Sequence, residues 1–187
     1  MNVHSRKNDV AMGSGLIARP NVGLGMVRRN RFRVECIGAD GKLKWAEEFD
    51  NLVVNAGLDD SLDKHLLGSA YTAAWYVGLT DGTPTPAAGD TMASHAGWAE
   101  ITAYSEATRE ALTLGAVSGQ SVDNSASKAS FSINDSTTVG GAFVVNESTK
   151  AGATGVLYGV GAFTEGDRAV VSGDTLNVTV TATAAAS

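Results

Sequence analysis

The chain has 187 residues, 43% hydrophobic and 18% charged, and a formal net charge of −6. These values fit one soluble globular domain with a real core. No apolar run approaches the roughly 20 residues of a membrane-spanning helix, so no membrane partner is expected. A single cysteine, Cys36, excludes an internal disulfide and leaves a cysteine-based zinc site without partners. We expect Cys36 to be a small buried hydrophobe.

Positive charge is concentrated at the N-terminus. The first 33 residues hold seven of the 14 cations and one of the 20 acids, so this segment is near +6 and the rest near −12. Its cations are Arg6, Lys7, Arg19, Arg28, Arg29, Arg31 and Arg33. Almost no apolar periodicity accompanies them, which predicts an extended basic arm over residues 1–30 that binds an acidic surface. A solvated tail that only keeps the protein soluble is the plainer alternative.

Nucleic acid is a weaker candidate partner for this arm. Base stacking needs aromatic side chains, and residues 1–31 contain none. The acidic body would also repel phosphate groups. A protein that accepts an extended basic strand is the partner that the charge pattern favours. Since the N-terminus lacks the apolar stretch of a signal peptide, we expect a chain that is made in the cytoplasm and either kept there or released by lysis.

The body, residues 31–187, is predicted to be mainly β. Alternation over 31–37, the turn Asp40-Gly41 and the return over 43–49 predict a first hairpin. Leucines at helical spacing predict one short helix near 56–67 that ends at Gly68. Further strands are expected at 74–80, 111–117, 128–133, 138–145, 155–163 and 174–183, the last with one wet face.

Together these elements favour an all-β fold. Short strands separated by turn residues, with a single convincing helix, predict one antiparallel β sandwich with jelly-roll-like character. A long connection over 81–97 interrupts the strands and leads to Trp98. His95 and Trp98 are the residues of this loop that could bind a glycan or form an interface, although core packing is the expected role of the tryptophans.

Catalytic and metal-binding candidates are sparse. Glu100, Glu106 and Glu110 could include an acid/base pair, but none of them lies in an unusually apolar run. His95 with Asp90 and Glu100 is the one conceivable set of metal ligands, and a hydrogen-bonded loop histidine is the better interpretation. We therefore expect a protein that is not an enzyme and that uses no cofactor and no metal.

Several sequence motifs of the body, taken together, resemble those of a known family. They are Asn51-Leu52-Val53-Val54-Asn55-Ala56-Gly57-Leu58, Ala74-Trp75-Tyr76-Val77-Gly78-Leu79, residues 90–100, Tyr104-Ser105-Glu106-Ala107-Thr108-Arg109, Gly140-Gly141-Ala142-Phe143 and residues 172–178. This succession resembles a family of small structural proteins of tailed bacteriophages. The resemblance covers roughly residues 50 to 182, and the basic arm lies outside it.

The resemblance implies a virion protein on the capsid surface. Similar small β-rich phage proteins are capsid decoration, or cement, proteins, often with jelly-roll-like folds and arms that lie on the major capsid protein. The major capsid protein is thus the expected partner, with self-association as a dimer or trimer. Two alternatives stay open: a tail-fibre or receptor-binding module that recognises a bacterial surface glycan, and a glycan hydrolase for which no carboxylate pair is evident.

Overall fold

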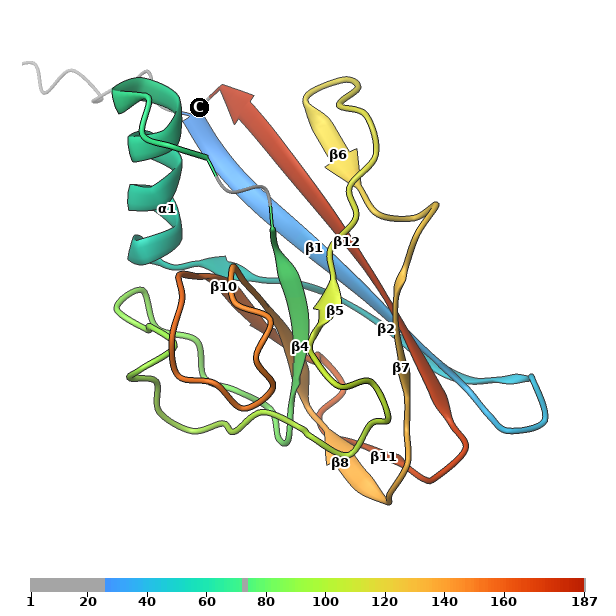
Figure 1. Ribbon diagram of the computed structural model, residues 1–187. Helices are drawn as coiled ribbons and strands as arrows, with labels where there is room; N and C mark the ends of the chain where they lie inside the picture. Colours follow the sequence, from blue (N-terminus) through green and yellow to red (C-terminus); the bar gives the residue numbers. More distant parts are fainter. Residues whose placement is uncertain (1–25, 72–73, 187) are drawn as a thin grey trace, which may run out of the picture.

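The computed structural model describes residues 26–71 and 74–186 of the chain (Figure 1). Their strands form two five-stranded antiparallel sheets and a two-stranded ribbon. Sheet A has the order β2-β1-β12-β6, and β7 pairs with the same edge of β12 as β6. Its strands are β1 (Met26–Ile37), β2 (Leu43–Asp50), β6 (Ser121–Asp123), β7 (Ala129–Ser132) and β12 (Thr175–Ala186).

Sheet B faces sheet A and has the order β3-β10-β9-β4-β5. Its strands are β3 (Leu52–Val53), β4 (Tyr76–Thr80), β5 (Glu110–Ala111), β9 (Gly141–Val145) and β10 (Leu157–Ala162). The ribbon pairs β8 (Thr137–Val139) with β11 (Arg168–Val170). This confirms the expected all-β, sandwich-like architecture with one short helix, whereas the jelly-roll part stays a prediction.

Sheet A is buried on one face only. In β12, Leu176, Val178 and Val180 are buried against sheet B, while Asn177 and Thr179 between them are partly exposed. Their alternation follows from the period of two in a strand, and it confirms the expected wet face. Within the core, Phe32 of β1 stacks on Phe49 of β2 with ring centroids 5.2 Å apart. Cys36 is fully buried among these side chains, as expected, and burial raises the pKa of its thiol to about 11.

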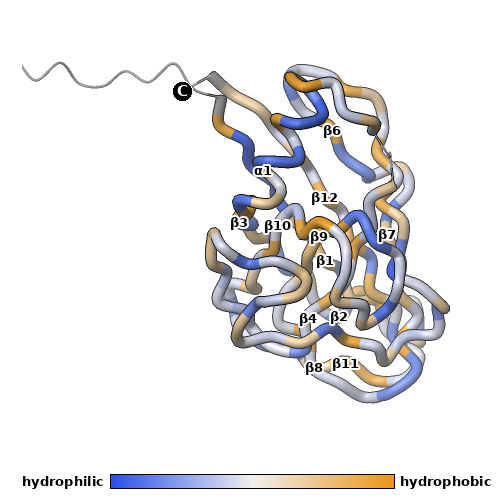
Figure 2. The backbone as a smooth tube through the Cα atoms, turned by 60° about the vertical axis from the view of Figure 1, so that its left-hand side comes forward, coloured by the Kyte–Doolittle hydropathy of each residue, from blue (hydrophilic) through white to orange (hydrophobic). Residues whose placement is uncertain are grey.

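Sheet B is buried on both faces. All five residues of β9 are buried, and the hydropathy colouring shows the apolar character of this strand (Figure 2). One face contributes Val77, Leu79 and Val144 to the core shared with sheet A. The other face forms a second cluster in which Phe143 and Leu157 pack with Trp98 and Met92. This cluster lies under the helix and under two long connections, 81–109 and 146–156. We call these two connections the loop layer.

The helix begins with α1 (Asn55–Leu62) and continues as the π-helical turn η1 (Asp63–Leu67). It ends at Gly68, as the sequence predicts, and the backbone of Gly68 is left-handed. Gly57 and Ser61 form its buried face. A Cβ on Gly57 would lie 2.4 Å from the carbonyl oxygen of Tyr158, so only glycine permits this close approach to β10. Because the small residues face the sheet, the leucines of the helix remain exposed.

The structure corrects several predicted boundaries. Of the expected 111–117 strand only Ala111 pairs with β4, in a two-residue strand that starts at Glu110, and the expected 138–145 strand is divided at Gly140 into β8 and β9. A Cβ on Gly140 would lie 2.0 Å from the carbonyl carbon of Gly82, which accounts for glycine at this break. β3, β6 and β11 were not predicted, because two or three residues are too short to show alternation.

Candidate binding site at the open end of the sandwich

The first strand starts earlier than the sequence indicates. β1 begins at Met26 and pairs with β12 over its whole length, from Met26 opposite Ala186 to Ile37 opposite Thr175. The arm expected over 1–30 therefore overlaps the strand, and Arg28, Arg29, Arg31 and Arg33 all belong to the body. Arg6, Lys7 and Arg19 lie outside the described residues. The chain before Met26 then has three cations and one acid, a net charge near +2 rather than +6.

The odd-numbered arginines of β1 lie on the outer face of sheet A. Arg33 donates to Glu48 at 2.6 Å and to Glu35 at 2.9 Å, and Arg31 lies 3.5 Å from Glu48. Lys128 extends the network with a 2.6 Å contact to Glu35. Hydrogen bonds from Lys128 and Arg33 hold the pKa of the Glu35 carboxyl below its usual value. Much of the positive charge on this face is thus balanced within the body.

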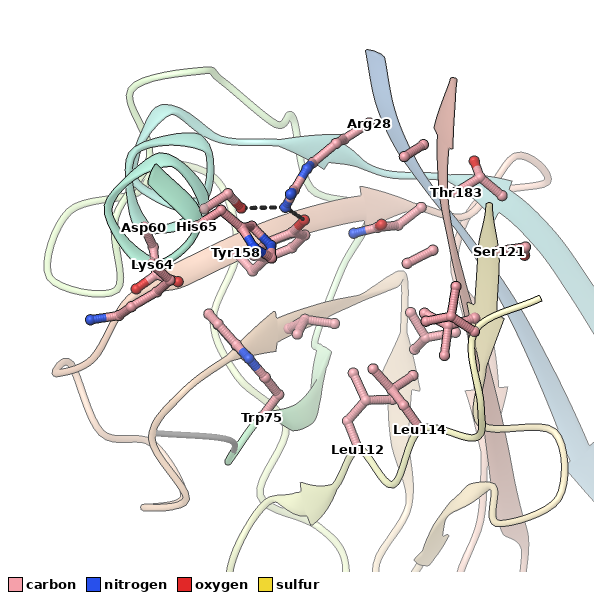
Figure 3. Close-up of a pocket in the computed structure, with 18 of the residues that line it drawn as sticks. Arg28, Asp60, Lys64, His65, Trp75, Leu112, Leu114, Ser121, Tyr158 and Thr183 are labelled. Carbon is pink, nitrogen blue, oxygen red and sulfur yellow. Dashed lines mark hydrogen bonds between the residues drawn. The ribbon is translucent and has the colours of Figure 1, made fainter. Parts of the chain in front are cut away.

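Arg28 points the other way, into a cavity at one end of the sandwich. The cavity has a volume of about 380 Å³ and lies where the two sheets diverge, between the end of β12 and the helix (Figure 3). Small side chains at the inward positions Ala182 and Ala184 help to leave this space open. The same end holds the start of β1, the end of β12 and β6 (Figure 1). We call it the open end.

Apolar side chains form most of the cavity wall. Trp75, Leu112 and Leu114 lie on one side, as Figure 3 shows, and Val144 and Val180 also line the space. Leu112 and Leu114 belong to the segment after β5, where the sequence predicted a strand. Their apolar side chains line the cavity instead. The walls suit an apolar body of a size typical for small ligands, since binding pockets usually measure roughly 300–1,000 Å³.

Two polar residues of β1, Arg28 and Asn30, are among those that line this apolar space. The Arg28 guanidinium donates to the hydroxyl of Ser61 at 2.5 Å and to that of Tyr158 at 3.3 Å. Both acceptors are neutral, and no carboxylate of the described residues lies within ion-pair distance of Arg28. Asn30, two residues on, is 3% exposed, and its Oδ1 has no hydrogen-bond partner among the described residues. Such a buried acceptor normally has a partner.

Four large apolar side chains near the open end are exposed, two that line the cavity and two on η1. Leu66 is 77% exposed, Leu67 81%, Tyr71 62% and Val117 74%. Tyr71 and Val117 line the cavity, while Leu66 and Leu67 follow Lys64 and His65, which also line it. We call these four residues the apolar rim. Exposed apolar side chains gathered at one place typically mark a binding surface.

The His95–Trp98 pair lies in the loop layer. Trp98 is 8% exposed, and its ring stacks on His95 with centroids 3.6 Å apart and contacts Phe143 at 5.1 Å. His95 and Phe143 pack against the indole of Trp98, so the ring has no open face on which a sugar could stack. Burial lowers the pKa of His95. This arrangement agrees with the core-packing role expected for Trp98.

Glu100 is committed to a structural ion pair. Arg109 binds both of its carboxylate oxygens, at 2.9 and 2.7 Å, and also donates to the carbonyls of Glu147 and Gly152. The Glu100 side chain is 5% exposed and that of Arg109 is fully buried. Both oxygens of this carboxylate are therefore engaged by the Arg109 guanidinium, in a bidentate pair that joins the loops.

The two remaining glutamates, Glu106 and Glu110, lie in different surroundings. Burial, followed by the nearby charge of Glu106, raises the pKa of Glu110, while Glu106 accepts from the backbone N–H of Ser132.

No group of three or more histidine, cysteine or acidic side chains arranged to hold a metal ion occurs in residues 26–71 and 74–186. Nor does any helix of the described part have the length and apolar character needed to cross a membrane.

Sequence reasoning did not find the cavity. Its lining comes from separate parts of the chain, and only the fold brings Arg28, Tyr158 and Trp75 together. The one local signal is in the last strand, where the inward residues change from valine (Val178 and Val180) to alanine. Alanine side chains are smaller and fill less of the core.

Comparison with known proteins adds no assignment. No protein-family model matches the chain, and no curated protein matches it significantly in sequence.

Proposed function

We propose that this chain is a phage virion structural protein, a decoration protein that binds and stabilises the shell of the major capsid protein. The observation that carries the proposal is the apolar rim at the open end, four large side chains with exposures of 62–81%. The motif resemblance of residues 50–182 supplies the context. A rigid sandwich whose ionic groups are largely satisfied internally suits a structural role.

The proposed contact combines the β body with the basic N-terminal segment. β1 begins at Met26, at the open end of the sandwich (Figure 1). Apolar burial at the rim would supply most of the binding free energy, at about 25 cal/mol per Å² removed from water. Arg6, Lys7 and Arg19 would add salt-dependent attraction to an acidic shell. Copies arranged around capsid symmetry axes would convert modest single contacts into avidity.

Co-sedimentation with undecorated shells tests this proposal. Replacing Leu66, Leu67 and Val117 together by Ser in the full chain should reduce binding about tenfold or more, because apolar anchors carry much of the energy of an interface. Leu43→Ser is the matched control: Leu43 is 56% exposed but lies at the β1–β2 turn, at the other end of the sandwich (Figure 1). Wild-type binding by the triple variant would refute the rim as the contact. Binding to isolated tails or to bacterial surface glycan, with none to shells, would favour the receptor-binding alternative.

A further inference from the structure

The helix directs its leucines away from the sheets. Leu58, Leu62 and Leu66 recur every four residues, a spacing that places side chains one above the other on one side of a helix. They are 40%, 54% and 77% exposed, and we call them the leucine row. The buried side of the helix is formed instead by Gly57 and Ser61. A continuous apolar surface thus remains open on the helix in the described structure.

The leucine row is separate from the cavity. Asp60 and Lys64 of the same helix line the cavity, whereas none of the helix leucines does. The cavity and the leucine row therefore lie on different sides of the helix. A molecule bound in the cavity would leave the leucine row uncovered.

Acidic side chains follow the leucine row along the helix. Asp59 and Asp63 each come one residue after a leucine of the row and lie four residues apart, so they form a neighbouring row. Asp63 already has partners, Lys64 at 3.3 Å and the hydroxyl of Ser69 at 2.7 Å. Asp59 is exposed and forms no ion pair with any described residue. An apolar row beside an available carboxylate fits an apolar partner that carries a cation.

The N-terminal segment of the same chain has this chemical character. Residues 1–25 contain three cations and one acid, whereas the helix, residues 55–67, contains three aspartates and one lysine. Leu16 and Ile17 are the only two consecutive large apolar residues of this segment, and Arg19 follows two residues later. The segment is thus complementary to the helix surface in both charge and apolar character.

The position of β1 and the length of the segment allow this contact. The start of β1 lies beside the helix (Figure 1), and Arg28 donates to Ser61 at 2.5 Å. Arg19 precedes Arg28 by nine residues, a stretch that spans up to about 30 Å when extended. The helix is only about 20 Å long, at 1.5 Å per residue. Residues 16–24 can therefore reach every leucine of the row.

We propose that residues 16–24 bind the helix of the same chain in the free protein. Leu16 and Ile17 pack on the leucine row, and Arg19 pairs with Asp59. Apolar burial supplies most of the affinity, because an exposed ion pair contributes little. This inference goes beyond the proposed function and does not depend on binding to shells.

Paramagnetic NMR on the full chain tests the inference. A nitroxide label is attached to the variant Ser14→Cys, two residues before Leu16. The native Cys36 should not react, because it is fully buried and burial raises the pKa of its thiol. We expect the label to broaden the amide signals of residues 58–66 more than those of β6, which lies at the same end of the sandwich (Figure 1). Equal broadening of the helix and β6 would overturn the inference.

Substitutions in the segment separate a specific contact from mere proximity. Replacing Leu16 and Ile17 together by Ser should lower the ratio of bound to unbound segment about tenfold or more, and the excess broadening of the helix should disappear. Replacing Val3 and Val10 together by Ser is the matched control, since these apolar residues lie outside the proposed contact, and it should preserve the broadening. Excess broadening that survives loss of Leu16 and Ile17 would also overturn the inference.

Substitutions on the helix test the other side of the contact. Replacing Leu58 and Leu62 together by Ser should remove the excess broadening, and its persistence would overturn the inference. Arg19→Gln should weaken the contact at most about fivefold, since it removes only an exposed ion pair. If a helix variant fails to fold, the segment variants decide the matter. Leu58 and Leu62 do not belong to the apolar rim, so failure of the shell experiment would leave this assignment intact.

A mixed sample distinguishes the same chain from a neighbouring copy. Isotope-labelled chain without nitroxide is combined with nitroxide-labelled chain that carries no isotope. We expect no excess broadening of the isotope-labelled helix, because the segment and the helix belong to one chain. Excess broadening in this sample would show that the segment binds a second copy and would overturn the same-chain assignment.

Discussion

Two regions of the molecule surround an inward-pointing arginine in opposite ways. In the loop layer, Arg109 binds both oxygens of Glu100 and two backbone carbonyls, and its side chain is fully buried. At the open end, Arg28 has two neutral hydroxyl partners and borders an unfilled space. A guanidinium with satisfied donors fixes loops to a sheet. One with spare donors beside an apolar cavity is available for recognition.

The strongest way to break this comparison is to remove Arg109. Arg109→Met leaves Glu100 buried without its cation, so we expect a loss of about 3–5 kcal/mol in the free energy of unfolding. Urea denaturation followed by tryptophan fluorescence measures this loss, and Arg29→Met serves as the control. A loss below about 1 kcal/mol would show that the loop layer does not depend on the pair.

The ion pair between Lys44 and Asp174 provides a pH test away from the cavity. Burial would raise the pKa of Asp174, but hydrogen bonds from Lys44 Nζ at 2.7 Å and from the N–H of Val171 at 3.0 Å outweigh it, so the pKa is lowered. The stabilisation is therefore complete above the unfolded pKa of about 4 and is lost as the pH falls through the lower, folded value.

Asp174→Asn should reduce stability at pH 7 by about 1 kcal/mol, a small value because Lys44 lies at the surface. The difference between variant and wild type should shrink as the solution is acidified below pH 4. Thermal or urea unfolding across pH 2–7 measures it. A difference that stays constant over this range would contradict the assigned ionisation.

Changes at the open end should affect stability least. Arg28→Met removes hydrogen bonds to two neutral groups, and Ser61 keeps its bond to the Gly57 carbonyl, so we expect a change within about 1 kcal/mol. The same urea titration compares it directly with Arg109→Met. A loss as large as that of Arg109→Met would mean that Arg28 holds the sandwich together and would remove the contrast between the two regions.

The sequence predicted best those elements whose local pattern agrees with their packing. Alternation over 31–37 and 174–183 identified the central strands of sheet A because one face of that sheet is buried and the other wet. In sheet B the same reasoning fails for boundaries, since β9 is buried on both faces and shows no alternation. Gly140 ended a strand for a reason that only the fold reveals, its contact with Gly82.

The positions and partners of the charged side chains were the hardest features to predict from the sequence. Clustering of arginines over 28–33 indicated an arm, but in the extended strand β1 the side chains alternate between faces, so Arg28 points inward while the odd-numbered arginines lie on the outer face. Their partners, Glu48, Ser61 and Tyr158, are distant in sequence, and no local pattern predicts them. The candidate site was missed for the same reason.

Pairing of β1 with β12 also sets an order of events during synthesis. Roughly 140 residues separate the two strands, and at about 5–20 residues per second the ribosome needs some 7–28 s to make them. Until then one long edge of β1 has no partner from its own chain, and an unpaired edge can accept a strand from a neighbouring copy. Crowded synthesis would thus favour exchange of β12 between molecules, whereas dilute synthesis would favour closure within one chain.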